Sequence, residues 1–295
     1  MKGNEGFENA AALLPGDIRA AAISLSERVK LAAEEFRLRA GAEPCVLTVE
    51  GERPFSSRKI TVRDLERVLE AATMASAHTA LGSVASGYVT VRGGCRVGLC
   101  GEVSRSGGEV LTIRRLSGAA IRIPREVKGC ADGILKSLTA GPWRDTLIIS
   151  PPGMGKTTLL RELVRRLSEA YRVGLLDERG EVAGVWEGVP EFDVGNRTDV
   201  LTGADKRSGA VMLLRSMNPQ LLAMDEITAS EDMDAVRAAA GCGVGLLASA
   251  HASSVEEMRR RPLYRELFAL GVFQRAVRIE VREHRRVYTL EEVGA

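Results

Sequence analysis

A lysine and two threonines follow a turn with two glycines, a combination suited to holding the phosphates of a nucleotide. The run is Ser-Pro-Pro-Gly-Met-Gly-Lys-Thr-Thr at residues 150–158. Gly153 and Gly155 let successive N–H groups point at one anion, and a helix beginning near Lys156 adds the positive end of its dipole. Lys156 supplies a mobile charge for the β- and γ-phosphates, and Thr157 offers a hydroxyl to Mg²⁺. These residues predict a site for ATP and Mg²⁺.

The flanking residues predict the strand and helix that such a loop requires. Residues 146–149 are a short apolar run, as in a strand buried on both faces, and the leucines and valine of 159–167 share one helical face. The pattern G-x-x-x-x-G-K-[ST] begins with glycine, where this chain has Ser150, whose small side chain we expect to fit. The predicted nucleotide-binding residues are Pro152, Gly153, Met154, Gly155, Lys156, Thr157 and Thr158.

Two carboxylates, Asp225 and Glu226, close another apolar run at residues 220–226. From the end of a strand, Asp225 can reach Mg²⁺ through water, so we assign it as a metal ligand together with Thr157. Glu226 can orient and deprotonate the attacking water. An alternative interpretation is that the pair caps the helix that begins around residues 228–230.

Two further predicted strands end in polar residues. His251 follows the strand at 244–249, where a neutral imidazole can bond the γ-phosphate or hold the water; its alternative role is to cap the next helix. Glu178 follows the strand at 172–176 and is our second active-site carboxylate, with Arg179 as a possible neutralising partner or both residues in a solvated turn. Ligands of open parallel sheets lie beyond the carboxyl ends of the strands, so these side chains should converge on the nucleotide.

The elements that position these residues alternate between strand and helix, which is typical of βαβ units and a mostly parallel sheet. The end of the chain returns to strands at 272–281 and 286–290. We predict strands at 145–149, 172–176, 220–225 and 244–249, and helices at 127–138, 156–169, 200–217 and 231–240. The fold class is therefore α/β.

The N-terminal part has a different pattern. The pattern of the first ~40 residues predicts helices, with Asp17 as an N-cap. A second helix is predicted from Thr61, its N-cap, to Ala72. We also predict a strand at 45–50, a hairpin at 88–103 that turns at glycines 93 and 94, and strands at 110–113 and 120–123. Pro124 should end this sheet. A small α+β domain of residues 1–124 thus precedes a nucleotide-binding domain of residues 125–295.

The composition favours a cytoplasmic globular protein. Lysine and arginine number 41 and aspartate and glutamate 39 in 295 residues, giving a net charge of +2, and aromatics are 4%. Both values weaken a nucleic-acid-binding interpretation. No run approaches the ~18 apolar residues of a membrane-spanning helix, and no signal peptide is visible. The five cysteines lack C-x-x-C spacing, so we expect free thiols, with Cys95 and Cys100 buried in strands.

The motifs together resemble a known family of ATPases. Four segments are similar to boxes of the additional-strand P-loop ATPases from type II and type IV secretion and pilus systems. They are the Walker A box at 153–158, the acidic box at 177–181, the Walker B box at 221–226 and the His box at 250–252. Residues 34–41, 87–99, 177–184 and 214–220 are similar to the family of stage III sporulation protein AA, and the resemblance extends from about residue 10 to 290. Walker B reads Asp-Glu where many secretion ATPases have Gly-Glu, which favours an Asp–Mg²⁺ and Glu-base arrangement.

The resemblance implies several properties. The fold would be a P-loop NTPase, RecA/AAA-like, with a small N-terminal domain. The activity would be that of a cytoplasmic mother-cell ATPase that energises a secretion-like channel during endospore formation. The chain would form a hexamer, with nucleotide between the two domains and adjacent subunits, and its partners would be membrane proteins of the channel. Arg215 is the preferred arginine to act in trans; Arg92, Arg96, Arg197 and Arg207 remain alternatives.

Three other functions share the phosphate loop. A nucleic-acid-handling ATPase of the recombinase or helicase type is the main alternative, although the near-neutral charge and the lack of an added nucleic-acid-binding domain disfavour it. A small-molecule kinase requires an acceptor pocket or lid, for which no segment is a candidate. A nucleotide-binding scaffold with little turnover would need neither Glu226 nor His251, so the presence of both residues disfavours this alternative.

Overall fold

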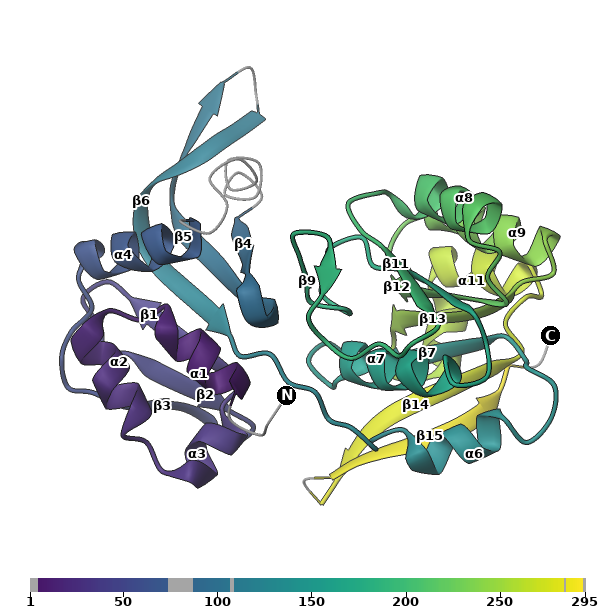
Figure 1. Ribbon diagram of the computed structural model, residues 1–295, viewed down its shortest axis with the longest axis horizontal. Helices are drawn as coiled ribbons and strands as arrows, with labels where there is room; N and C mark the ends of the chain where they lie inside the picture. Colours follow the sequence, from purple (N-terminus) through teal and green to yellow (C-terminus); the bar gives the residue numbers. More distant parts are fainter. Residues whose placement is uncertain (1–4, 74–86, 107–108, 284, 294–295) are drawn as a thin grey trace. The chain divides into compact units, whose positions relative to one another are not determined.

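The computed structural model describes residues 5–73, 87–106, 109–283 and 285–293, with only the backbone of residues 106 and 109–111. The chain folds into two compact units, Met1–Arg125 and Glu126–Ala295. They run from purple to blue and from teal to yellow in Figure 1. Within the described ranges no helix has the length and apolarity needed to cross a bilayer.

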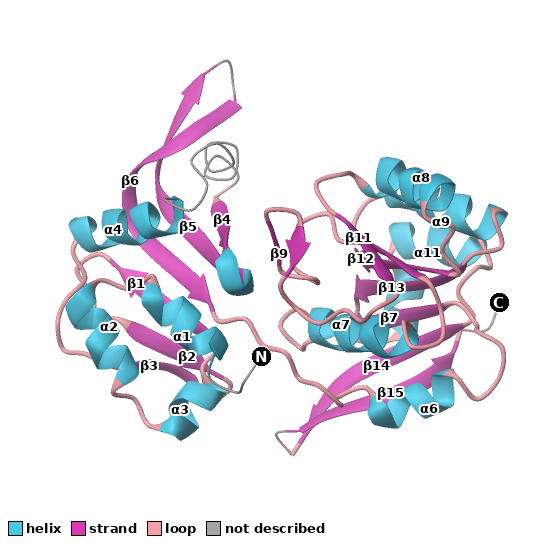
Figure 2. Ribbon diagram, in the orientation of Figure 1, coloured by secondary structure: helices cyan, strands magenta, loops and turns pink. Residues whose placement is uncertain are grey.

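The first unit is a six-stranded antiparallel sheet in the order β3-β2-β1-β6-β5-β4, with helices packed against it (Figure 2). Its helices are α1 (Glu5–Ala12), α2 (Gly16–Ile23), α3 (Glu27–Ala32), α4 (Val62–Thr73) and the 3₁₀ turn η1 (Arg92–Gly94). Its strands are β1 (Glu35–Arg39), β2 (Cys45–Thr48), β3 (Gly51–Pro54), β4 (Tyr88–Val91), β5 (Cys95–Ser106) and β6 (Glu109–Arg122).

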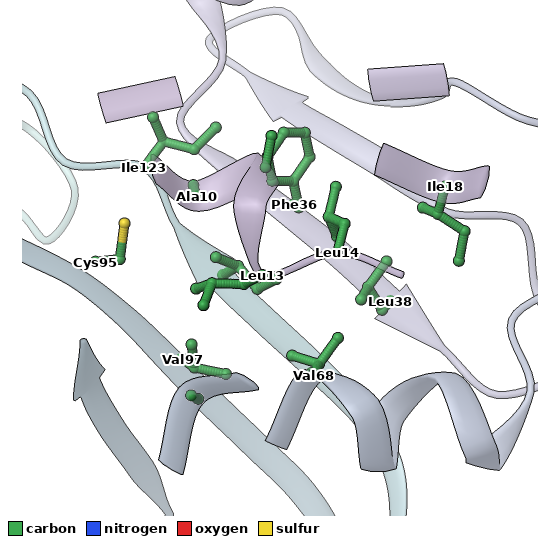
Figure 3. Packing of buried hydrophobic residues seen from close by; sticks show 14 of the residues in the cluster. Ala10, Leu13, Leu14, Ile18, Phe36, Leu38, Val68, Cys95, Val97 and Ile123 are labelled. Atoms are coloured by element: carbon green, nitrogen blue, oxygen red, sulfur yellow. The ribbon is translucent and has the colours of Figure 1, made fainter. Parts of the chain in front are cut away.

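The core of this unit lies between the helices and one face of the sheet. Figure 3 shows Leu14, in the turn between α1 and α2, and Ile18 of α2 on the same side of the sheet as Phe36 and Leu38 of β1. The rings of Phe7 and Phe36 pack edge to face with centroids 5.2 Å apart. Burial of these apolar side chains is the main force holding the helices on the sheet.

Strand β1 corrects the expectation that the first ~40 residues are helical. Phe36 and Leu38 are fully buried, whereas the charged residues between and beside them are more exposed. This alternation has the period of two of a strand, and pairing with β2 and β6 fixes it. Asp17 likewise lies in the first turn of α2, whose N-cap is Pro15.

Other N-terminal predictions have mixed outcomes. The hairpin of β4 and β5 is confirmed, with a turn at Arg92–Gly94 in which Gly93 has φ 83°. Thr61 caps α4, because its Oγ1 accepts the Asp64 N–H at 3.2 Å while Asp64 accepts the Thr61 N–H at 2.8 Å. The strands expected at 110–113 and 120–123 are instead parts of the single strand β6.

The second unit contains a seven-stranded sheet in the order β11-β8-β12-β13-β7-β14-β15, parallel except for β15. Its strands are β7 (Thr146–Ser150), β8 (Val173–Leu176), β11 (Thr198–Leu201), β12 (Leu221–Glu226), β13 (Gly245–His251), β14 (Arg275–Arg282) and β15 (Arg285–Glu292), with a separate pair β9 (Val185–Trp186) and β10 (Val189–Pro190). Its helices are α6 (Asp132–Leu138), α7 (Lys156–Leu167), α8 (Lys206–Ser216), α9 (Asp232–Gly241), α10 (Val255–Arg260) and α11 (Pro262–Ala269).

Helices cover both faces of this sheet, which explains the apolar runs of its strands. Ile148 packs with residues of α6 and α7 on one face, whereas Leu147 and Ile149 pack with residues of α8 to α11 on the other. Alternate residues of each central strand therefore enter two separate cores. The expected α/β order is confirmed for the strands that carry the candidate site.

Two predicted helices are shorter than expected. Helix α6 begins at Asp132 and not at 127, because Gly129 adopts φ 80° and its N–H bonds the carboxylate of Glu162. The helix expected at 200–217 begins at Lys206, because residues 198–201 pair with β8 as β11. All five cysteines are free as expected, but Cys100 is exposed.

Candidate active site

The loop that the sequence predicts to bind phosphate, residues 150–158 and below called the phosphate-binding loop, joins the buried end of β7 to the first turn of α7. Gly153 and Gly155 have φ of 75° and 96°, values at which a side chain would be strained. Gly155 is the N-cap residue of α7, so the helix begins at Lys156 as predicted. Pro152 and Gly153 are exposed, and Met154, Thr157 and Thr158 are half-buried.

The structure brings the other predicted strand ends beside this loop. His251 at the end of β13 lies opposite Ser150 of β7, and Glu226 at the end of β12 lies opposite Ser249 of β13. Asp177 directly follows β8, the next strand along the sheet. Four neighbouring strands therefore deliver their carboxyl ends to one edge, where open α/β sheets bind ligands.

A chain of hydrogen bonds joins three of these residues. Lys156 Nζ lies 2.6 Å from His251 Nδ1 and 3.4 Å from the Ser150 carbonyl oxygen. His251 Nε2 lies 2.7 Å from Glu226 Oε2. Because an ammonium group only donates, Nδ1 accepts, and the ring proton on Nε2 is donated to Glu226. Burial lowers the pKa of Lys156, while Glu226 and Asp225 oppose that effect.

A β-bulge places both acids of β12 at this edge. Met224 lies opposite Ala248 of β13 and Glu226 opposite Ser249, so Asp225 is an extra residue in the pairing. In a regular strand, adjacent side chains point to opposite faces. Here Asp225 accepts a hydrogen bond from Ser249 Oγ at 3.4 Å, while Glu226 contacts the histidine of the same neighbouring strand.

Asp225 lies among other acids. Its pKa is raised to about 6, chiefly by burial and then by the neighbouring acids Asp177, Glu181 and Glu226, while Lys206 opposes the rise. Asp177 is itself fully buried, and burial raises its pKa. This excess of desolvated negative charge favours a bound cation, and carboxylate oxygens are ligands that Mg²⁺ prefers.

The side chain of Asp177 shapes the acidic segment that follows β8. Its Oδ1 accepts the Glu181 N–H at 2.9 Å and its Oδ2 accepts the Ala183 N–H at 2.8 Å. Arg161 of α7 contacts the same segment, because its Nη2 donates to the Glu181 carbonyl oxygen at 3.0 Å. The acidic segment is thereby fixed to the helix that follows the phosphate-binding loop.

Glu178 pairs with a lysine instead of joining the hydrogen-bonded chain of Lys156, His251 and Glu226. Its Oε2 lies 2.9 Å from Lys206 Nζ, and Lys206 also lies 3.6 Å from Asp232 Oδ1. Asp232 Oδ2 accepts the N–H groups of Thr228 at 2.8 Å and Ala229 at 3.1 Å. Lys206, and not Arg179, is therefore the structural partner of Glu178.

Arg215 is not brought to this edge. It lies exposed in the last turn of α8, shortly before β12 begins. The site lies where β12 ends, so within one chain Arg215 is at the opposite edge of the sheet.

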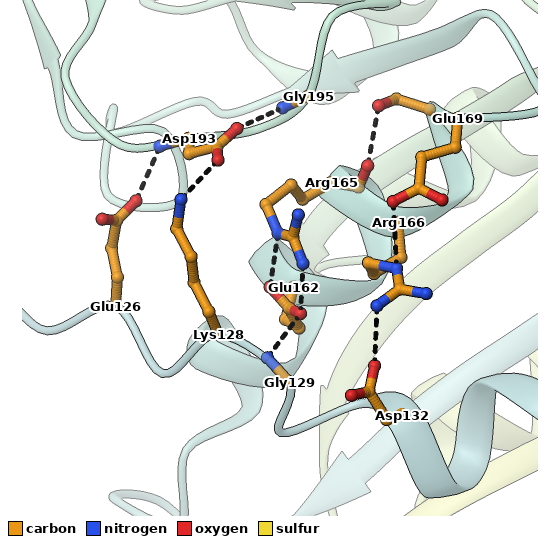
Figure 4. Close-up of polar contacts among 11 residues, drawn as sticks. Glu126, Lys128, Gly129, Asp132, Glu162, Arg165, Arg166, Glu169, Asp193 and Gly195 are labelled. Atoms are coloured by element: carbon orange, nitrogen blue, oxygen red, sulfur yellow. Dashed lines mark hydrogen bonds and ion pairs between the residues drawn. The ribbon is translucent and has the colours of Figure 1, made fainter. Parts of the chain in front are cut away.

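Polar contacts also fix α7 to the start of the second unit (Figure 4). Glu162 Oε1 accepts the Gly129 N–H at 2.8 Å and a bond from Arg165 Nη2 at 2.7 Å. Lys128 Nζ lies 2.6 Å from Asp193 Oδ2, which ties the same segment to the loop before β11. These contacts therefore hold α7, the helix that begins at the phosphate-binding loop, against the segment around Gly129.

Three residues that contact the site were not predicted from the sequence. Ser249 and Lys206 are described above, and Arg286 Nε of β15 donates to the Met154 carbonyl oxygen at 2.9 Å. Lys206 had only an indirect signal, because it follows Asp205, which accepts the Ser208 N–H as the N-cap of α8. No spacing rule connects Lys206 to Glu178 or Arg286 to Met154.

Asp225→Asn should stabilise the metal-free protein at pH 7 and leave its stability unchanged at pH 4. An acid whose pKa is raised in the folded state stabilises below its ordinary pKa and loses that contribution as the pH rises through the folded value, here from about 4 to 6. Asparagine removes the partly desolvated charge, for a gain of about 3 kcal/mol at most. Thermal unfolding in EDTA across this range measures the difference, and a lower melting temperature for the variant at pH 7 would contradict it.

Two comparisons, with a family model and with a curated relative, point to the same family. The family model described as sporulation stage III, protein AA matches residues 8–289. The chain is 37% identical over 271 residues to stage III sporulation protein AA of Bacillus subtilis (strain 168). That alignment covers 90% of this chain and 88% of the relative.

Two solved structures share the fold across most of the chain. The ATPase DotB of Legionella pneumophila has a TM-score of 0.58 at 16% identity, covering 97% of this chain and 78% of that chain. The pilus retraction motor PilT with bound ADP has a TM-score of 0.60 at 19% identity, covering 91% and 82%. With the mostly parallel sheet and the N-terminal antiparallel sheet, these likenesses confirm the expected P-loop α/β fold.

Proposed function

The chain belongs to the sporulation stage III protein AA family, and on this basis we propose that it is a Mg²⁺-dependent ATPase. The proposal extends to a homo-oligomer that energises a secretion-like channel at a membrane during endospore formation. The observation that carries the catalytic part is the hydrogen-bonded chain of Lys156, His251 and Glu226 beside a glycine loop. DotB is an ATPase and the PilT structure holds ADP, which supports nucleotide binding by this chain.

Phosphate binding would use residues 152–158. Lys156 is 6% exposed, and its lowered pKa reflects a cation that has lost water without gaining a full counter-charge. A β- or γ-phosphate oxygen would provide that charge, which stabilises the ammonium and the bound nucleotide together. The N-terminus of α7 adds N–H donors and the positive end of the helix dipole.

Mg²⁺ would be held by Thr157 and Asp225. The fit rests on the half-buried carboxylate of Asp225, whose raised pKa indicates that the folded site lacks compensating positive charge. When bound, Mg²⁺ would neutralise part of the negative charge of the phosphates.

Glu226 would orient the attacking water and take its proton. Its Oε2 is occupied by His251, while the side chain remains 30% exposed, so a carboxylate oxygen is accessible to water. The bond from His251 fixes the carboxylate, and Lys156 in turn fixes the tautomer of His251. Glu178 would act as a second acid near the site, oriented by Lys206.

The assembly and its location complete the proposal. Residues 1–124 would form the N-terminal domain and residues 125–295 the ATPase domain of a hexamer. Arg215, exposed and remote from its own site, is then free to approach the nucleotide of a neighbouring subunit. The partners would be membrane proteins of a sporulation channel, with the ATPase in the cytoplasm and peripheral to the membrane through them.

The purified full chain should hydrolyse ATP with Mg²⁺, stop in EDTA and show the same rate with or without single-stranded DNA. Phosphate release is measured in Mg²⁺ and in EDTA, each with and without single-stranded DNA. No hydrolysis in Mg²⁺ would contradict the ATPase assignment, whereas strong stimulation by DNA would favour the recombinase or helicase type of function.

The channel role requires a separate test. A pull-down with the tagged chain from sporulating cells should recover membrane channel proteins in the presence of ATP. Recovery of nucleic acid and no membrane protein would contradict the role at a membrane.

A further inference from the structure

The C-terminal hairpin extends beyond the sheet beside the phosphate-binding loop. Residues 275–278 of β14 pair in parallel with residues 146–149 of β7. The next residues of β14, together with the start of β15, therefore continue past the end of β7, where the loop begins. Arg286 lies in this extension, opposite Val281 (the yellow hairpin in Figure 1).

Arg286 contacts the backbone of the loop directly. Its Nε donates to the Met154 carbonyl oxygen at 2.9 Å. A Cβ atom built on Gly155 would lie 3.0 Å from the same Nε and 3.5 Å from Cζ of the guanidinium. The guanidinium thus lies against the peptide that joins Met154 to Gly155. In the part of the chain that the structure describes, no ion pair joins Arg286 to a carboxylate.

The geometry of a peptide bond links this contact to the phosphates. In a trans peptide the C=O and the following N–H lie in one plane and point in opposite directions. A donor that holds the Met154 carbonyl oxygen therefore turns the Gly155 N–H away from Arg286. Gly155 has φ 96°, and because glycine adopts positive and negative φ about equally readily, its own preference does not fix the orientation of this peptide.

We propose that Arg286 is a positioning residue for nucleotide binding: it holds the Met154–Gly155 peptide so that the Gly155 N–H faces the phosphates. The inference rests on the proposed ATPase function. It assigns a nucleotide-related role to the last strand of the sheet, about 130 residues beyond the loop in sequence.

Arg286→Ala should weaken ATP binding about tenfold, as expected for one lost restraint on a binding group. The free-protein melting temperature should change little, because Arg286 is exposed. Hydrogen exchange of the peptide covering residues 151–158 should become faster without nucleotide. Arg286→Lys should recover part of the affinity, since an ammonium can also donate to the carbonyl oxygen.

Arg285→Ala is the matched control, because Arg285 is an exposed neighbour that points to the opposite face of β15. It should keep native affinity and native exchange. Native ATP affinity in Arg286→Ala, or equal losses in both alanine variants, would overturn the inference. Lys156→Ala in the same assay distinguishes a failure of this inference from a failure of the proposed function. If Lys156→Ala binds ATP like the native chain, the proposed function fails. If Lys156→Ala loses ATP binding while Arg286→Ala keeps it, only the role of Arg286 is overturned.

Discussion

Lys156→Ala should reduce ATP affinity by about a hundredfold or more, to the limit of detection. The side chain contributes a desolvated ammonium, and a charge-assisted hydrogen bond to phosphate is worth about 3 kcal/mol, equivalent to that factor. The loss should appear in isothermal titration with ATP and Mg²⁺. The fold should survive, because burial already lowers the pKa of Lys156 and its charged form is therefore not a source of stability.

Lys136→Ala provides the control for this experiment. Lys136 is an exposed lysine of α6, so its removal changes the net charge by the same amount without affecting the loop. It should bind ATP like the native chain. Retained affinity in Lys156→Ala would mean that residues 150–158 do not bind the phosphates, and the ATPase proposal would lose its foundation.

Glu226→Gln should bind ATP with native affinity and hydrolyse it about a hundredfold more slowly or worse, the usual size of a general-base contribution. Glutamine has nearly the same shape and can still accept the bond from His251 Nε2, which lies 2.7 Å from the present carboxylate. It cannot accept a proton from water. Phosphate release under saturating ATP, together with the binding constant, separates the loss of chemistry from a loss of affinity.

Glu231→Gln is a suitable comparison, since Glu231 is an exposed acid shortly after β12. Its turnover should remain native. If Glu226→Gln also turns over at the native rate, the base must be another acid. Glu178 would then be the next candidate, although it is bonded to Lys206 and would have to exchange that partner for water.

The arrangement of the second unit could be predicted because local and global signals agree there. Apolar runs followed by polar tips indicated parallel strands, and the rule that their carboxyl ends share an edge brought Lys156, Glu226 and His251 together. Glycines at 153 and 155 indicated a turn in the backbone, and the structure shows positive φ at both. The glycine signal is local, and the convergence of the strand ends follows from a general rule for parallel sheets.

What could not be predicted depends on contacts between distant residues. The pairing of Lys206 with Glu178 and of Arg286 with Met154 leaves no periodic trace in the sequence. The strand at 35–39 was missed because the helical pattern of the preceding residues was extended over a short alternating segment. The bulge in β12 was missed because it follows from the register with β13 and not from any residue type.

That bulge makes the acidic pair sensitive to the number of residues in β12 as well as to their identity. Deleting one apolar residue between Leu221 and Met224 would leave both carboxylates in the chain, and the sequence would still read as an apolar run followed by Asp-Glu. The strand would then either resume regular pairing, which sends the two acids to opposite faces, or keep the bulge and draw them away from His251. Sequence length between the start of β12 and its acids is therefore under the same chemical constraint as the acids themselves.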